Sequence, residues 1–297
     1  MITATTTKAL ADALAPARDG KQSIGLVPTM GALHDGHLSL ISRAVKENDT
    51  VVVSIFVNPI QFNNQEDLQK YPRTLDDDLN KIEQLADGSG RKVIAFAPSV
   101  EEMYPEPVTT TYHFGPIEEV MEGPRRPGHF SGVAVVVKRL FDLVQPQRAY
   151  FGEKDFQQIA IIRELLRQTQ LPITLVPCPI VRADDGLALS SRNMRLSPAA
   201  RNMAPAIYAT LCQAVEMSYC EELPDVKDWV ADTLDTFHEV NPQPDGLQFE
   251  VEYFEIVNDT TLQPIDTWDD APGIVGCIAV WLDGVRLIDV IRFRPEA

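Results

Sequence analysis

Basic residues are scarce in this sequence: 26 Lys and Arg stand against 43 Asp and Glu among 297 residues, a formal net charge of −17. A molecule with this excess of negative charge repels nucleic-acid backbones and anionic lipid headgroups. We therefore expect no nucleic-acid partner and no membrane partner. An anionic substrate has to find a local positive pocket inside an acidic protein.

Cysteine and long hydrophobic runs are also scarce. The four cysteines show no C-x-x-C spacing, which excludes a recognisable zinc motif or disulfide framework and favours the reducing cytoplasm. The longest apolar runs, such as 277–282, fall far short of the roughly 20 residues that cross a bilayer. Residues 1–22 lack the continuous apolar segment of a signal peptide, so we expect an unexported cytoplasmic protein.

The residues that are present predict two domains. A 44% apolar fraction is ample for a core, and 297 residues exceed what one core usually serves. In residues 1–183, short apolar runs alternate with segments of helical periodicity, which predicts a doubly wound parallel α/β domain. The predicted strands there are 23–27, 51–57, 93–96, 148–151 and 173–176. The predicted helices are 8–17, 38–48, 74–85, 132–144 and 155–168, and 98–130 is expected to be irregular. In residues 184–297, predicted helices 198–219 and 226–240 precede predicted strands 249–254, 274–282 and 286–291, which indicates a second, smaller α+β C-terminal domain.

The turn after the first of these strands carries Gly31, His34, Gly36 and His37. In an open α/β sheet such a turn lies at the carboxyl end of a strand, where the next helix directs unpaired N–H groups at an anion. It is neither a dinucleotide fingerprint, which needs a third glycine, nor a P-loop, because His37 and Leu38 replace Lys-Ser/Thr. Paired imidazoles here favour stabilisation of charge on a phosphate; helix capping is the alternative.

Two further segments carry cations. Lys154 follows the fourth strand and suits a triphosphate, although a helix start capped by Asp155 is the simpler alternative. Ser190, Ser191 and Arg192 follow a glycine-containing loop at the domain junction. They suit a mobile clamp for pyrophosphate, the alternative being a serine-rich linker.

Neutral amides and a carboxylate run complete the candidates. Asn58, Gln61 and Gln158 suit the hydrogen bonding of a polyol carboxylate without adding charge. The run 76–78 offers hard oxygen ligands for Mg²⁺, while a solvated acidic helix start is the alternative.

Six motifs in order resemble the pantothenate synthetase (pantoate–β-alanine ligase) family: PTMGALHDGH at 28–37, FVNPIQF at 56–62, YPRT at 71–74, RPGHF at 126–130, GEKDFQQ at 152–158 and LSSRN at 189–193. The resemblance implies a Rossmann-like domain, 1–183, that binds nucleotide and pantoate, a lid domain, 184–297, and a homodimer. It implies ATP-dependent activation of pantoate to pantoyl adenylate with release of pyrophosphate, and then attack by β-alanine to give pantothenate and AMP.

The resemblance also implies residue roles. Catalysis is assigned to His37, His34, Lys154 and Arg192, with His37 as proton donor. ATP binding is assigned to Met30, Gly31, Ala32, Leu33, His34, Asp35, Gly36, His37, Gly152, Glu153, Lys154, Asp155, Val181, Leu189, Ser190, Ser191 and Arg192. Gln61 and Gln158 are expected to contact pantoate, Gln61 also β-alanine, and Mg²⁺ is expected near Asp77 and Asp78. Lys81 departs from the pattern, because a Mg²⁺-binding member has an amide there.

Two other functions fit part of the pattern. One is a nucleotidyltransferase that keeps the nucleotide in its product; the resemblance implies the histidine-turn nucleotidyltransferase superfamily, which includes such enzymes. The amides Asn58 and Gln61 and the second domain count against it. The other is a nucleotide-binding protein without turnover. Release of AMP only in the presence of β-alanine separates the ligase from both.

Overall fold

The computed structural model describes residues 1–241 and 246–293, which form two compact units. The first unit comprises residues 1–114, 125–153 and 158–179. The second takes 180–297 together with two short excursions, 115–124 and 154–157. The second unit is therefore assembled from three separate stretches of chain.

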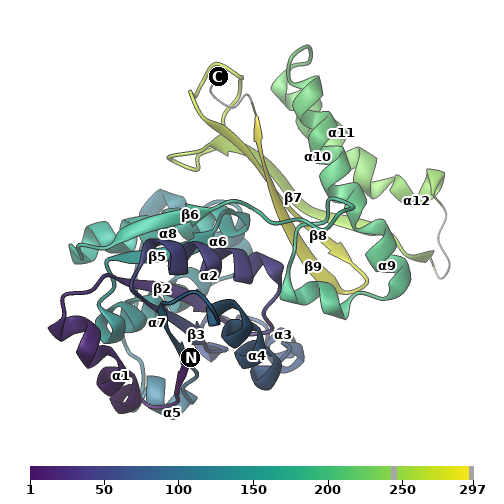
Figure 1. Ribbon diagram of the computed structural model, residues 1–297. Coiled ribbons are helices and arrows are strands. Elements are labelled where there is room, and N and C mark those ends of the chain that lie inside the picture. The colour runs from purple at the N-terminus through teal and green to yellow at the C-terminus, as the bar shows by residue number, and fades with distance from the viewer. Residues whose placement is uncertain (242–245, 294–297) are drawn as a thin grey trace. The chain divides into compact units, whose positions relative to one another are not determined.

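A six-stranded parallel sheet forms the centre of the first unit, in the order β1-β4-β3-β2-β5-β6 (Figure 1). Its strands are β1 Ile2–Ala4, β2 Ile24–Thr29, β3 Thr50–Ile55, β4 Lys92–Phe96, β5 Arg148–Gly152 and β6 Thr174–Cys178. Strands β2, β3 and β4 are nearly continuous apolar runs, because a parallel sheet is covered on both faces.

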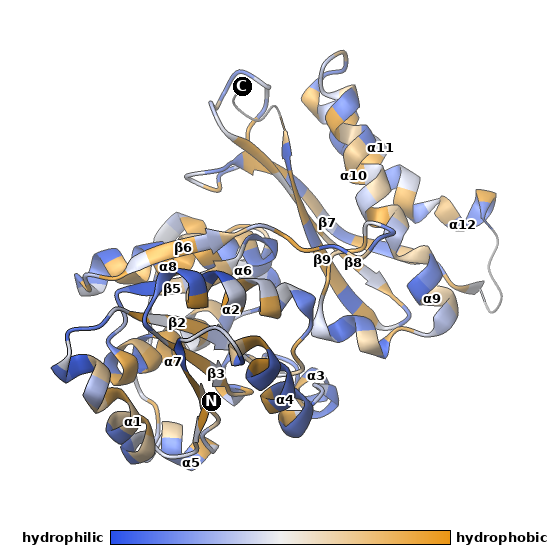
Figure 2. Ribbon diagram, in the orientation of Figure 1, coloured by the Kyte–Doolittle hydropathy of each residue, from blue (hydrophilic) through white to orange (hydrophobic). Residues whose placement is uncertain are grey.

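Helices cover the sheet. The helices that belong wholly or mainly to this unit are α1 Thr7–Asp19, α2 Asp35–Glu47, α3 Gln65–Lys70, α4 Leu75–Ala86, α5 Val100–Met103, α7 His129–Val144 and α8 Phe156–Thr169. Helices α2 and α4 pack on each other and on one face, where Ile41, Val53 and Ile82 share a buried cluster. Helices α1 and α7 pack together and contact β4 and β2. Figure 2 shows hydrophilic residues in blue and hydrophobic residues in orange on α4, as expected for an amphipathic helix.

The strand order places a switch point at β2. The chain leaves β2 for β3 on one side and returns later to β5 on the other side of β2. Because the three strands are parallel, their carboxyl ends meet at one edge of the sheet. That edge is where open α/β sheets bind ligands, and β2 ends there at Thr29, directly before the histidine turn.

The second unit contains a three-stranded antiparallel sheet, β7 Phe249–Asn258, β8 Ile274–Leu282 and β9 Val285–Phe293, in the order β7-β8-β9. Its helices are α9 Pro198–Met203, α10 Pro205–Met217, α11 Leu223–Asp235 and α12 Phe237–Val240, while α6 Glu122–Arg125 begins in its first excursion. Apolar residues of α9, α10 and α11 form one buried cluster with residues of the sheet. The register between β7 and β8 shifts between Val251 and Tyr253, which makes a β-bulge at Glu252.

The α/β domain and the smaller α+β domain that the sequence predicts are confirmed, with five local corrections. The helix predicted over 226–240 is divided at Thr236 into α11 and α12. The helix predicted over 198–219 is two helices, since Pro205 has no N–H to continue the first and begins the second. The region 98–130 holds short helices, among them α5 and the 3₁₀ turn η2 Gly115–Glu118. Strand β1 and helix α3 have no predicted counterpart.

No helix in residues 1–241 and 246–293 combines the length and the apolar character needed to span a lipid bilayer.

Candidate active site

The turn between β2 and α2 has an unusual backbone. Gly31 and Ala32 both have positive φ, 79° and 48°, and such a conformation costs free energy for alanine. A Cβ on Gly31 would lie 3.0 Å from Asp78 Oδ2 and 3.1 Å from Ile55 Cγ2. Glycine is thus favoured at 31 by its φ, and a Cβ there would force Asp78 or Ile55 to shift by a few tenths of an ångström.

The two histidines lie side by side at the start of α2. His34 is the N-cap residue, with extended backbone, and its ring centroid is 4.0 Å from that of His37. The His34 N–H donates to Nδ1 of His37 at 3.4 Å, so a neutral His37 ring carries its proton on Nε2. Both rings are half-buried. The turn thus combines two imidazoles with the N-terminus of a thirteen-residue helix, a favourable arrangement for an anion.

Helix α4 holds this turn in place. Asp78, which is 0% exposed, accepts from the backbone N–H of Ala32 at 2.9 Å and of Leu33 at 2.7 Å. Lys81, one helical turn later, donates to the Leu33 carbonyl at 2.6 Å. The Thr74 hydroxyl donates to the same carboxylate at 3.3 Å.

These bonds do not fit the Mg²⁺ site that the family resemblance implies. Both oxygens of Asp78 are engaged with the backbone, whereas Mg²⁺ usually keeps several waters around exposed carboxylates. Asp77 is exposed, and the described residues hold no group of three or more His, Cys, Asp and Glu suited to a metal ion. The arrangement gives no support to metal binding by Asp77 and Asp78.

Gln61 lies at the end of the neighbouring strand, in the 3₁₀ turn η1 Pro59–Gln61. Its amide donates to Met30 Sδ at 3.1 Å and accepts from Asn58 Nδ2 at 3.1 Å. Asn58 is 1% exposed; it also donates to the Gly132 carbonyl and accepts from the Tyr104 hydroxyl. The side-chain amide of Asn58 is fully engaged in hydrogen bonds within the protein. Asn58 therefore supports Gln61 and is poorly placed to contact substrate directly.

Helix α7 packs against η1 and holds it in place. His129 Nδ1 donates to the Gln61 carbonyl at 2.8 Å. A Cβ on Gly132 would lie 2.7 Å from Gln61 Cα, so only glycine permits this approach of the helix. The RPGHF motif at 126–130 entered the sequence analysis only through the family resemblance. The structure gives its His129 a role, which is to hold the backbone of Gln61.

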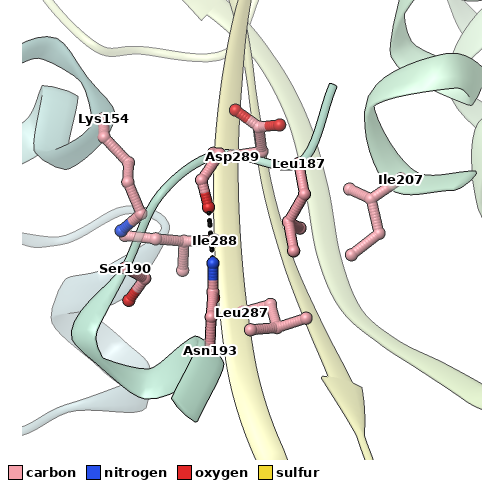
Figure 3. Close-up of a pocket in the computed structure, with 9 residues that line it drawn as sticks. Lys154, Leu187, Ser190, Asn193, Ile207, Leu287, Ile288 and Asp289 are labelled. Carbon is pink, nitrogen blue, oxygen red and sulfur yellow. Dashed lines mark hydrogen bonds between the residues drawn. The ribbon is translucent and has the colours of Figure 1, made fainter. Parts of the chain in front are cut away.

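In the second unit, Lys154 and Ser190 line one small pocket that is partly open to solvent. Its walls include Asn193, Leu287 and Asp289. Figure 3 shows the ammonium end of Lys154 directed toward Ser190 and Ile288, while Asn193 Nδ2 donates to the Ala188 carbonyl at 3.0 Å. Lys154 and the serine segment, which the sequence predicts as separate motifs, are thus brought together.

The segment 181–192 is a tight loop. The Leu189 N–H donates to the Val181 carbonyl at 3.0 Å, and Ser190 caps the 3₁₀ turn η4 Ser191–Arg195. Arg182 forms a bidentate ion pair with Asp289, at 2.6 and 2.9 Å, and its guanidinium lies 3.5 Å from the Tyr208 ring centroid. This pair attaches the loop to β9, a support that the sequence did not indicate.

A second buried network supports the helix start at Lys154. Gln157 donates to the carbonyls of Ile117 and Val120, both at 2.8 Å, and accepts from the Glu122 N–H at 3.0 Å. The Glu122 carboxylate pairs with Arg286 on β9 and accepts from the Tyr253 hydroxyl at 2.7 Å. Burial and the Glu122 charge raise the pKa of Tyr253 well above its ordinary value.

Arg286 is the centre of this network. It binds Glu122 through two nitrogens at 2.8 Å and also pairs with Glu252, the bulge residue of β7. Burial opposes its charged form, but the bonds to these two carboxylates hold the pKa of Arg286 above its ordinary value.

The remaining predicted residues take ordinary positions. Gln158 lies half-buried on the first turn of α8, and Gly152 and Glu153 end β5 and begin the 3₁₀ turn η3 Glu153–Asp155. The Asp35 side chain is exposed on the first turn of α2.

Known proteins match this chain along nearly its whole length. The family model described as pantoate-beta-alanine ligase matches residues 2–292. Pantothenate synthetase of Bacteroides fragilis is 50% identical over 275 residues, 93% of each chain. That of Porphyromonas gingivalis is 50% identical over 289 residues, 97% of this chain and 98% of the relative.

Solved structures agree as well. Pantothenate synthetase from Thermus thermophilus has a TM-score of 0.87 at 42% identity, covering 99% of this chain and all of that one. The ligase from Francisella tularensis, crystallised with β,γ-ATP and β-alanine, has a TM-score of 0.79 at 33% identity over 98% of this chain and 97% of that one. On these grounds the chain belongs to the pantoate–β-alanine ligase family and is an enzyme.

Proposed function

We propose that this enzyme condenses pantoate with β-alanine at the expense of ATP, through a pantoyl adenylate, and releases AMP and pyrophosphate. The observation that carries the proposal is the family match along residues 2–292, which includes all six motifs. The side-by-side histidines on the turn after β2 give that match a chemical basis.

The first step forms a bond between a pantoate carboxylate oxygen and the α-phosphorus of ATP, while the bond to pyrophosphate breaks. Negative charge accumulates on the phosphate oxygens in the transition state, so fixed donors lower the barrier. We assign this work to His34, His37 and the N–H groups of α2 and, as the family resemblance implies, to Lys154 and Arg192. His37 is the assigned proton donor, and its Nε2–H suits it.

The second step is attack of the β-alanine amine on the acyl carbon, with AMP as leaving group. Gln61 and Gln158 are assigned to the carboxylate and hydroxyl groups of pantoate, and Gln61 also to β-alanine. Neutral amides suit this role, because they bind without attracting a competing cation. Asn58 is assigned the support of Gln61.

ATP contacts are assigned to 30–37, 152–155, Val181 and 189–192, as the resemblance implies. Mg²⁺ is expected to arrive on the ATP phosphates, whose oxygens and waters suffice as ligands, and no protein ligand is assigned. We further propose a homodimer in the cytoplasm; the four unpaired thiols fit a reducing compartment.

The test is incubation with ATP, Mg²⁺, pantoate and β-alanine, with each omitted in turn and the products identified by mass. With all four we expect pantothenate, AMP and pyrophosphate. Without β-alanine we expect one turnover to enzyme-bound pantoyl adenylate. A nucleotide retained in the final product would identify a nucleotidyltransferase instead, and ATP binding without turnover would identify a nucleotide sensor.

Substitution of Gln61 by alanine should separate the two substrates. Loss of a hydrogen bond to a charged ligand costs about 1.5–3 kcal/mol, so the KM for pantoate should rise about 10- to 100-fold. The KM for ATP should stay within about twofold, since one amide contact on pantoate does not touch the nucleotide. Steady-state kinetics provides the measurement, with the exposed Gln65→Ala as control. Equal effects on both KM values would remove Gln61 from the acid pocket.

A further inference from the structure

The three acidic residues at the start of α4 differ sharply in environment. Asp76 and Asp77 are exposed, whereas Asp78 is fully buried. Burial of a carboxylate is costly unless donors compensate it, and two backbone N–H groups at 2.9 and 2.7 Å do so here. The bonds of Asp78 are therefore directed at the histidine turn.

The turn needs such support. Ala32 holds φ at 48°, a conformation that L-residues avoid unless neighbouring structure imposes it. Asp78 accepts hydrogen bonds from the N–H groups of Ala32 and Leu33, while Lys81 donates one to the Leu33 carbonyl. The two side chains are three positions apart, on one face of α4, and hold both polar groups of the Leu33 backbone.

We propose that Asp78 and Lys81 are positioning residues: together they clamp residues 32–33 so that His34 and His37 meet the reacting phosphate in a fixed orientation. The residue directly after Leu33 is His34, the N-cap of α2, so any movement of the clamped backbone turns both rings. Lys81 fits this role, because its ammonium forms a strong bond to the Leu33 carbonyl. The inference rests on the proposed role of the histidines.

The direct test is hydrogen exchange at the Ala32 and Leu33 amides, measured by NMR, which needs no catalysis. In Asp78→Asn the amide NH₂ replaces one acceptor, and exchange at these two sites should accelerate about tenfold or more. Glu83→Gln makes the same carboxyl-to-amide change at an exposed position of α4 and should leave exchange unchanged. Unchanged exchange in Asp78→Asn would overturn the clamp.

Kinetics distinguishes positioning from metal binding. We expect kcat for pyrophosphate release to fall about tenfold or more in Lys81→Met and to recover largely in Lys81→Arg, with the KM for ATP nearly constant. The Mg²⁺ concentration for half-maximal rate should not change in either variant or in Asp78→Asn. A raised Mg²⁺ requirement in Asp78→Asn would make Asp78 a metal ligand and overturn the proposal. If Asp78→Asn does not fold, the Lys81 pair decides alone, and undiminished kcat in Lys81→Met contradicts the clamp.

Failure of the enzymatic proposal has a different signature. In that case the parent protein makes no pantothenate, while the exchange comparison between Asp78→Asn and Glu83→Gln still reports on the clamp.

Discussion

Replacement of His37 by alanine should leave ATP bound but nearly abolish pantoate-dependent release of pyrophosphate. Removal of one donor to a developing charge typically costs about 3 kcal/mol, or 100- to 1,000-fold in rate. Ground-state binding should change little, because the phosphate charge that His37 is assigned to stabilise increases only as the bond to pyrophosphate breaks. Calorimetry with a non-hydrolysable ATP analogue measures binding, and rapid quench measures a single turnover.

Two comparisons make this result specific. His113→Ala removes an exposed imidazole on the same unit and should behave as the parent protein. His34→Ala should also slow the chemical step, and the double variant should lose less than the sum of the two, since the rings lie 4.0 Å apart and act together. Undiminished formation of pantoyl adenylate by His37→Ala in one turnover would refute its assigned role.

Substitution of Arg286 by methionine should strongly destabilise the second unit. It keeps much of the side-chain volume but leaves Glu122 and Glu252 without their cation, and breaking a buried ion pair in this way costs about 3–5 kcal/mol. All three tryptophans, Trp229, Trp268 and Trp281, belong to this unit. Tryptophan fluorescence in urea therefore follows its unfolding selectively.

The ion-pair account predicts partial recovery when the stranded charge is removed as well. Glu122→Gln combined with Arg286→Met should be more stable than Arg286→Met alone, because one uncompensated buried carboxylate is gone. Lys227→Met breaks a half-exposed pair with Glu255 and should lower the free energy of unfolding by less than about 1 kcal/mol. A urea midpoint for Arg286→Met equal to that of Lys227→Met would show that the network contributes little.

The sequence predicted helices and strands well where the spacing of apolar residues and the turn residues indicate the same boundaries. The strand over 274–282 has the bounds of β8, and the helix over 74–85 differs from α4 by one residue at each end. Strand β1 has three residues, two of them exposed, so it shows no pattern of its own and exists through pairing with β4. The break at Pro205 has a cause in the sequence, because proline lacks the N–H that would continue α9.

The candidate site was predictable to the extent that its residues belong to motifs at strand ends. What could not be predicted is which polar residues support the others. The run 76–78 gives no sign that only Asp78 turns inward, since that depends on how α4 packs against α2. Glu122 and Arg286 are 164 positions apart, and neither lies in one of the six motifs. Such partners emerge only when the fold brings them together.

Because the second unit is discontinuous in sequence, a single cut of the chain cannot separate it whole from the first. A fragment that starts near residue 180 carries Arg286 and Tyr253 but leaves Glu122 and Gln157 behind on the amino-terminal piece. The severed half would retain a buried guanidinium with one carboxylate in place of two, and Lys154 would stay with the other half. The boundary that looks natural along the sequence is therefore a poor place to cut, and the two halves are expected to function only as one continuous polypeptide.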